Sequence, residues 1–271
     1  MQLLVSYHRH FDHSPQDVLY INKEYFTKTN MSIWPMIAII SFAALLHASF
    51  QLSVSVLTVL SGHALGAKRP KAQLISLVGS YVGGIVVTTM LVFSALAYFA
   101  TLFFSYNQPT LAWILLAGIN VAVGGSVLLF YFRKTNGTEL WLPRRFAEDL
   151  AKRAKGITQP EEAFALGVMS IFIELAFIAA PLSIAVLTLV NLPAWQQVGG
   201  LALYVALSSL PILIIASLVG GGHKISTIQR WREQNKRFLQ YAAGSGLIVL
   251  GLYIFIAEVV GRIALDGSTL L

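Results

Sequence analysis

The sequence predicts an all-α polytopic membrane protein with six transmembrane helices arranged as an inverted 3+3 repeat. Three observations predict this fold. Of the 271 residues, 56% are hydrophobic and only 11% are charged, whereas a soluble domain carries about 25% charged residues. Six apolar segments are long enough to cross a bilayer, which takes about 20 helical residues. A long basic loop separates the first three segments from the last three.

The predicted transmembrane helices cover residues 34–62, 72–104, 111–132, 163–190, 198–219 and 238–257. The first, second and fourth are longer than a bilayer requires, which is typical of helices that tilt, kink or contain a re-entrant break. Length alone does not choose among these.

The basic residues predict how the helices are oriented. Three loops, after the first, third and fifth helices, hold 15 of the 19 lysines and arginines, and the opposite turns "SYNQPT" and "NLPAWQQ" hold none. The positive-inside rule places these loops in the cytoplasm and both termini outside a bacterial-type plasma (inner) membrane. The net charge of +7 therefore reports orientation, and no nucleic-acid partner is expected.

The parts of the chain follow from these segments. Residues 1–30 are either a mis-called extension, with Met31 as the true start, or a loosely ordered polar tail. Residues 31–132 form the first three-helix repeat and 163–257 the second, and 258–271 are a C-terminal tail. The loop 133–162 carries Phe146, Leu150 and Ala154 at helical spacing, which predicts a short amphipathic helix on the cytoplasmic membrane surface or a solvated linker helix.

The two halves begin in a similar way. "SFAALLHASFQ" at 41–51 and "AFALGVMSIFIE" at 163–174 each bring a polar residue toward mid-membrane depth. The first helix runs inward and the fourth runs outward, so the halves are inverted. In inverted-repeat transporters the binding site lies near the midplane between the repeats, on broken helices.

Glu174 is the most informative residue, because it lies in the apolar segment "IFIELAFIAAP". A charge at the bilayer centre costs about 2.5–3.5 kcal/mol. Glu174 is therefore either protonated or directed at a watery cavity or a partner. No lysine or arginine lies in the six segments, so His47 is the basic candidate for a proton-handling pair with it. The alternative is a neutral carboxyl that only packs against a neighbouring helix.

Other polar residues and prolines extend this candidate site. His47, Gln51, Ser55 and Thr58 form one stripe along the first helix. We interpret His47 and Gln51 as an ion path or substrate contacts, and Ser55 and Thr58 as further site residues or as hydrogen bonds between helices. The remaining candidates are Ser170, one turn before Glu174; Asn120, which lines the site or packs; and two hinge prolines, Pro181 and Pro211.

Glycines predict where helices pack closely. Gly79 and Gly83 form a GxxxG motif in the second helix, and Gly244, Gly246 and Gly251 recur in the last.

Catalytic and metal-binding patterns are absent from the sequence. It has no cysteine, no Walker A motif, no HExxH motif and no nucleophile elbow. We therefore expect no enzyme activity, no cofactor and no metal site.

Three stretches carry a resemblance to a known family. They are "SVSVLTVLSGHALGAKRPKAQLISLVGSYVGGI" at 53–85, "FALGVMSIFIEL" at 164–175 and "NKRFLQYAAGSGLIVLGLYIF" at 235–255. Together they resemble the LysE/RhtB exporter superfamily, which also includes CcdA/DsbD membrane domains and peptidoglycolipid-addressing proteins. Ser53-Val54-Ser55 stands where the family has a Pro-Gly-Pro-like break, and Glu174 stands near an Asn-Pro. Without cysteine, the thiol chemistry of the CcdA/DsbD branch cannot operate.

The resemblance and the buried carboxylate together predict a proton-coupled exporter of a small solute, such as an amino acid or a metabolite. Glu174 would bind the proton, and His47 and Gln51 would be its partners or would contact the substrate. The expected partners are the lipid bilayer and a small-molecule substrate, and a homodimer is left open. The alternative function is a non-transporting membrane protein that helps to assemble or localise envelope components through residues 133–162.

Overall fold

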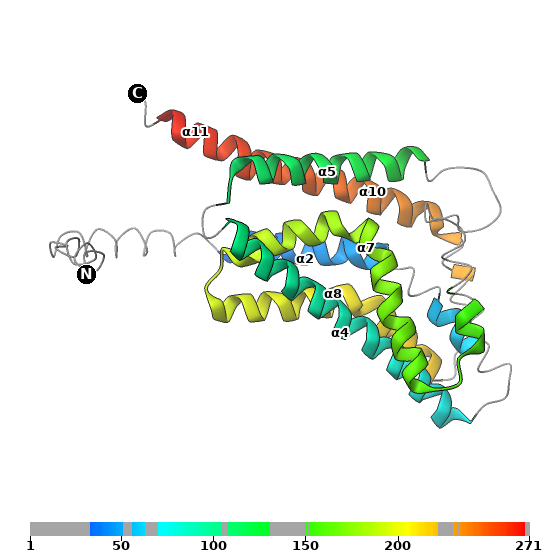
Figure 1. Ribbon diagram of the computed structural model, residues 1–271. Coiled ribbons are helices and arrows are strands. Elements are labelled where there is room, and N and C mark those ends of the chain that lie inside the picture. Colours follow the sequence, from blue (N-terminus) through cyan, green and yellow to red (C-terminus); the bar gives the residue numbers. More distant parts are fainter. Residues whose placement is uncertain are drawn as a thin grey trace, which may run out of the picture. The chain divides into compact units, whose positions relative to one another are not determined.

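The computed structural model describes residues 33–50, 56–62, 70–104, 108–130, 150, 152–221, 230–231 and 234–268. Within these ranges every regular element is helical. The main elements are α2 (Ile33–Ser49), α4 (Lys71–Phe104), α5 (Thr110–Phe130), α7 (Pro160–Val190), α8 (Ala194–Gly220), α10 (Lys236–Ile254), the π-helix η1 (Phe255–Val260) and α11 (Gly261–Ser268) (Figure 1). The chain divides into two units, Met1–Ile37 and Ala38–Leu271. All contacts described below lie in the second unit, which includes α2 from Ala38 onward.

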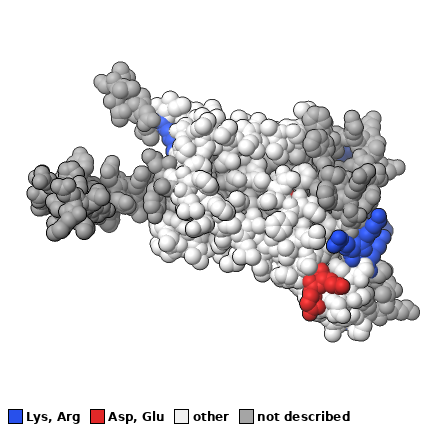
Figure 2. Space-filling model, viewed as in Figure 1, with Lys and Arg blue, Asp and Glu red and all other residues white. Residues whose placement is uncertain are grey.

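Five helical spans in the described residues are long and apolar enough to cross a membrane. They are Lys71–Phe104, Thr110–Leu129, Pro160–Val190, Ala194–Gly220 and Arg237–Ala264. This is the architecture of a helical membrane protein. Figure 2 agrees, because the charged atoms on the face shown lie toward the ends of the molecule, with a broad uncharged band between them.

The first predicted span differs from its expected extent. The sequence predicts a helix over 34–62, but α2 ends at Ser49, after 17 residues. The Phe50 N–H donates to the His47 carbonyl at 3.1 Å in the turn that follows. A separate helical stretch covers 56–62. α2 is thus shorter than the five spanning helices, and Gln51 and Ser55 lie outside the described residues.

α4 and α7 cross with their backbones in contact. A Cβ atom added to Gly84 would meet the Phe164 carbonyl oxygen, and one added to Gly167 would meet the Tyr81 carbonyl oxygen. Small residues let helices approach this closely. The GxxxG prediction was wrong in its position: a Cβ on Gly79 would meet nothing within 4 Å, and one on Gly83 would only touch the Phe164 ring at 4.0 Å.

α5 and α10 lie side by side and form a second close contact (Figure 1). A Cβ on Gly124 would lie 2.6 Å from the Gly244 carbonyl oxygen, and one on Gly251 would lie 2.8 Å from the Ala117 carbonyl oxygen. Gly244 and Gly251 of the last helix therefore pack against α5, whereas Gly246 packs against Leu46 and Phe42 of α2.

The predicted amphipathic helix of the central loop packs into the protein. Residues 152–156 are helical. Leu150, Ala154 and Ile157 are buried in one apolar cluster with residues of the 56–62 stretch, α4, α7 and α8. Its apolar face is thus covered by the chain's own helices, and the place of this helix relative to the membrane surface stays a prediction. Phe146 lies outside the described residues.

The C-terminal part is also different from expectation. The sequence predicts that the last helix ends at Ala257 and that 258–271 form a tail. Instead, η1 and α11 continue the helix from α10 to Ser268. The apolar span extends to Ala264.

The α4–α7 crossing yields a stability prediction. We expect Gly84→Ala to lower the free energy of unfolding by about 1–3 kcal/mol, because the new methyl group forces two backbones apart. The matched control is Gly79→Ala on the same helix, where the methyl group enters open space. Unfolding of the detergent-solubilised protein would compare them, and equal stability of the two variants would contradict the crossing.

Candidate functional site

α7 holds a buried carboxyl group midway along its length. The helix begins at Pro160, and the Glu162 carboxylate accepts hydrogen bonds from the backbone N–H groups of Thr158 and Gln159, at 3.1 and 3.3 Å. Glu174 lies 14 residues after the start of α7 and 16 before its end at Val190, and its exposed fraction is 0%. The helix therefore holds a carboxyl group midway along an apolar span.

Tyr81 and Ser170 form a hydrogen bond beside this carboxyl. The Tyr81 Oη and the Ser170 Oγ are 3.0 Å apart, and both side chains are buried. The Ser170 hydroxyl also donates to the Leu166 carbonyl at 2.9 Å. Because a serine hydroxyl has one proton to donate, Tyr81 is then the donor to Ser170. Glu174 follows Ser170 by one helical turn and lies within electrostatic range of the Tyr81 hydroxyl.

His47 is bonded to a different helix. Its Nδ1 lies 3.0 Å from the Tyr204 Oη, which joins α2 to α8, and both side chains are buried. The Phe93 ring of α4 packs on the Tyr204 ring, with centroids 4.8 Å apart. The direct pair of His47 with Glu174 expected from the sequence is not among the contacts that the structure describes. Near the end of α2, Phe50 instead stacks on Phe177 of α7, with centroids 6.4 Å apart.

The two tyrosine bonds are related by one constant offset along the chain. Ser170 follows His47 by 123 positions, and Tyr204 follows Tyr81 by the same 123 positions. The last residues of the two similar segments, Gln51 and Glu174, are also 123 positions apart. Each bond therefore joins a residue of the first half to a residue of the second. In one bond the tyrosine belongs to the first half, and in the other it belongs to the second.

Asn120 bonds to the second part of α7 next to Pro181. The Asn120 Nδ2 donates to the Leu116 carbonyl in its own helix at 2.9 Å and to the Ala180 carbonyl at 3.3 Å. Its buried Oδ1 has no hydrogen-bond partner in the described part of the chain. Pro181 lies inside α7, and the helix bends sharply along its length (Figure 1), as proline favours. Asn120 thus ties α5 to α7 beside the proline.

The remaining sequence-predicted residues are less informative. Pro211 lies inside α8, which continues through it to Gly220. That either proline acts as a hinge stays a prediction, as does any role of Gln51 and Ser55.

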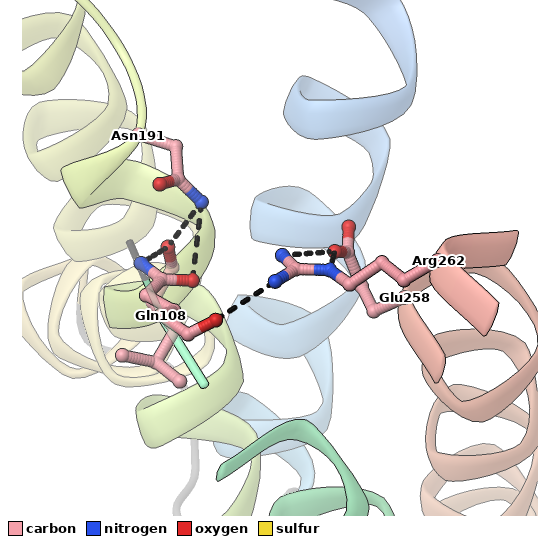
Figure 3. A network of polar contacts seen from close by, with 5 residues as sticks. Gln108, Asn191, Glu258 and Arg262 are labelled. Carbon is pink, nitrogen blue, oxygen red and sulfur yellow. Dashed lines mark hydrogen bonds and ion pairs between the residues drawn. The ribbon is translucent and has the colours of Figure 1, made fainter. Parts of the chain in front are cut away.

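A separate polar network lies at the ends of α4 and α7 (Figure 3). The Gln108 side chain donates to the Leu187 carbonyl at 2.9 Å and accepts from the Asn191 Nδ2 at 3.2 Å. Arg262 donates to the Gln108 carbonyl at 2.8 Å and to the Glu258 carboxylate at 2.9 Å. This network fastens the C-terminal helix to the α4–α5 and α7–α8 turns.

Sequence reasoning missed Tyr81 and Tyr204. Tyrosine is amphipathic and was counted with the apolar residues, so neither stood out as polar. A usable signal existed, because a tyrosine far from the membrane interface buries a hydroxyl that needs a hydrogen-bond partner. Gln108, Asn191 and Arg262 were missed because they lie in turns or beyond the last predicted helix.

No protein-family model, no curated protein and no solved structure matches this chain. Among the described residues, no group of three or more His, Asp and Glu side chains lies close enough to hold a metal ion.

The Tyr81–Ser170 bond is testable by a double-mutant cycle. We expect Tyr81→Phe and Ser170→Ala to show a coupling free energy of about 0.6 kcal/mol, the average for hydrogen bonds inside membrane proteins. Tyr81→Phe combined with Tyr204→Phe is the matched comparison and should be additive within about 0.3 kcal/mol, because these hydroxyls belong to different bonds. Unfolding in mixed micelles would measure both, and equal coupling in the two cycles would contradict the pairing.

Proposed function

We propose that this protein is a proton-coupled transporter that exports a small solute, with Glu174 as its proton-binding residue. The observation that carries the proposal is a fully buried carboxyl group midway along an apolar helix, one turn from the Tyr81–Ser170 hydrogen bond. Ionisable residues within membrane spans are rare and mark ion or substrate pathways.

The chemistry of a buried carboxyl explains how it would couple a proton to movement. The protonated form is neutral and tolerates apolar surroundings. The ionised form needs water or hydrogen-bond donors, because burying a bare charge is costly. The nearby Tyr81 hydroxyl becomes such a donor when its bond to Ser170 opens, and water entering along the helices would be another. The protonated and the ionised forms of Glu174 thus favour different positions of α4 relative to α7.

An inverted 3+3 repeat, with α2 as its shorter first helix, is part of the proposal. The constant offset of 123 positions between the two tyrosine bonds supports it, because equivalent residues in two repeats make equivalent contacts. On this arrangement the site lies between the halves, with both termini outside and the basic loops in the cytoplasm of a plasma (inner) membrane. The LysE/RhtB resemblance favours an amino acid or a similar metabolite as the substrate.

The proposal predicts the effect of neutralising Glu174. In liposomes with an internal pH dye and an imposed pH gradient, a mixed pool of amino acids should trigger proton movement through the native protein. Glu174→Gln should abolish that movement, because an amide of similar size cannot exchange a proton. The matched control is Glu161→Gln, an exposed carboxyl on the same helix, which should leave proton movement unchanged.

Two outcomes would contradict the proposal. If Glu174→Gln moves protons as fast as the native protein, Glu174 is a neutral side chain of helix packing. If the native protein moves no protons with any fraction of the pool, proton coupling is wrong, and the non-transporting role in envelope assembly or localisation gains support.

A further inference from the structure

We infer that the Tyr81–Ser170 and His47–Tyr204 hydrogen bonds are two equivalent gates, one on each side of Glu174. The inference rests on the proposed function, because a gate has meaning only for a protein that moves a solute or a proton. It assigns a role in transport to two further residues, Tyr81 and Tyr204.

Contacts between helix ends define the two sides of the molecule. The Gln73 side chain donates to the Thr158 carbonyl at 3.4 Å, so the beginnings of α4 and α7 lie together. The Gln108–Asn191 bond shows that their ends also lie together, where α5 and α8 begin. α4 and α7 therefore run in the same direction, and α8 starts from the opposite end.

The two bonds lie at matching depths from these opposite ends. Tyr81 is ten residues after Lys71, and Ser170 is ten residues after Pro160, the first residues of α4 and α7. Tyr204 is ten residues after Ala194, the first residue of α8. At 1.5 Å per residue each bond is about 15 Å along the helices from its own end. Glu174 lies near the middle of α7, between these two depths.

The chemistry of the two bonds suits a gate. Each joins a side chain of one half to a side chain of the other through a neutral hydrogen bond, a contact that inside membrane proteins stabilises by about 0.6 kcal/mol. When a bond opens, its hydroxyl must find another partner, and water entering from that end supplies one. Both bonds are formed in this structure, and Glu174 is fully buried. The state described is therefore closed at both ends.

The test uses the absence of cysteine from the chain. A single Ile178→Cys, one turn after Glu174 and buried, reports access to the space between the gates. In oriented vesicles, a membrane-impermeant maleimide is added from one side at a time. A separate Lys152→Cys, at an exposed position, identifies the side on which the beginnings of α4 and α7 lie.

We expect Tyr81→Phe to raise the labelling rate of the reporter at least fivefold from the side of the Lys152 marker and to leave the other side unchanged. Tyr204→Phe should do the reverse. Ser170→Ala removes the same bond as Tyr81→Phe and should reproduce its result. Tyr98→Phe, an exposed tyrosine on α4, is the matched control and should change neither side.

Labelling from the same side in both variants, or no change in folded variants that elute as the native protein does, would overturn the inference. The assay needs neither a substrate nor a pH gradient, so its result is separate from that of Glu174→Gln. If side-specific labelling appears but Glu174→Gln still moves protons, the gates stand and the proton site is wrong. If Glu174→Gln abolishes proton movement but labelling does not change, the tyrosine bonds are packing contacts.

Discussion

The backbone contact where α4 crosses α7 fixes the positions of the candidate site residues. Gly84 and Gly167 leave no room for a Cβ atom between the two helices. Between hydrocarbon-facing helices no hydrophobic force drives association, so close packing and hydrogen bonds have to supply it. The approach at the glycines brings the Tyr81 hydroxyl to the Ser170 hydroxyl, and Glu174 follows one turn later on the same helix. The position of a buried carboxyl thus depends on two residues without side chains.

The halves share polar chemistry but differ in packing. At the offset of 123 positions, the equivalents of Gly84 and Gly167 are Leu207 and Ala44. The α2–α8 pair therefore keeps the tyrosine bond, yet has larger side chains where α4 and α7 have glycine. If the two pairs were packed identically, the two ends of the molecule would be equally easy to open. Different packing gives the ends different stabilities, and on the proposed function a change in the charge of Glu174 would shift the balance between them.

The sequence predicts the long helices and the burial of Glu174 well, because both depend on local apolar length. It predicts close packing at the glycines of the last helix, but not that Gly244 and Gly251 meet α5 while Gly246 meets α2. It does not predict the partners of Tyr81 and Tyr204, which lie 89 and 157 positions away and meet only through tertiary packing. For Leu150 and Ala154, helical spacing identifies an apolar face but not what covers it. The structure shows that the protein's own helices cover this face. The end of α2 at Ser49 was not predicted because the spacing of His47, Gln51 and Ser55 also fits one face of a continuous helix.

The polar network at Arg262 limits how the neighbouring gate opens. It fastens the α4–α5 turn, the end of α7 and the C-terminal helix to one another. The first turn of α8 is held as well, because the Gln197 side chain donates to the Leu192 carbonyl at 2.8 Å. Four helices carry gate residues, and three of them, α4, α7 and α8, are tied at this end. α2 contributes no residue to the bonds described there. Opening the His47–Tyr204 gate therefore requires the least disruption if α2 moves away from α8 while the other three helices keep their contacts.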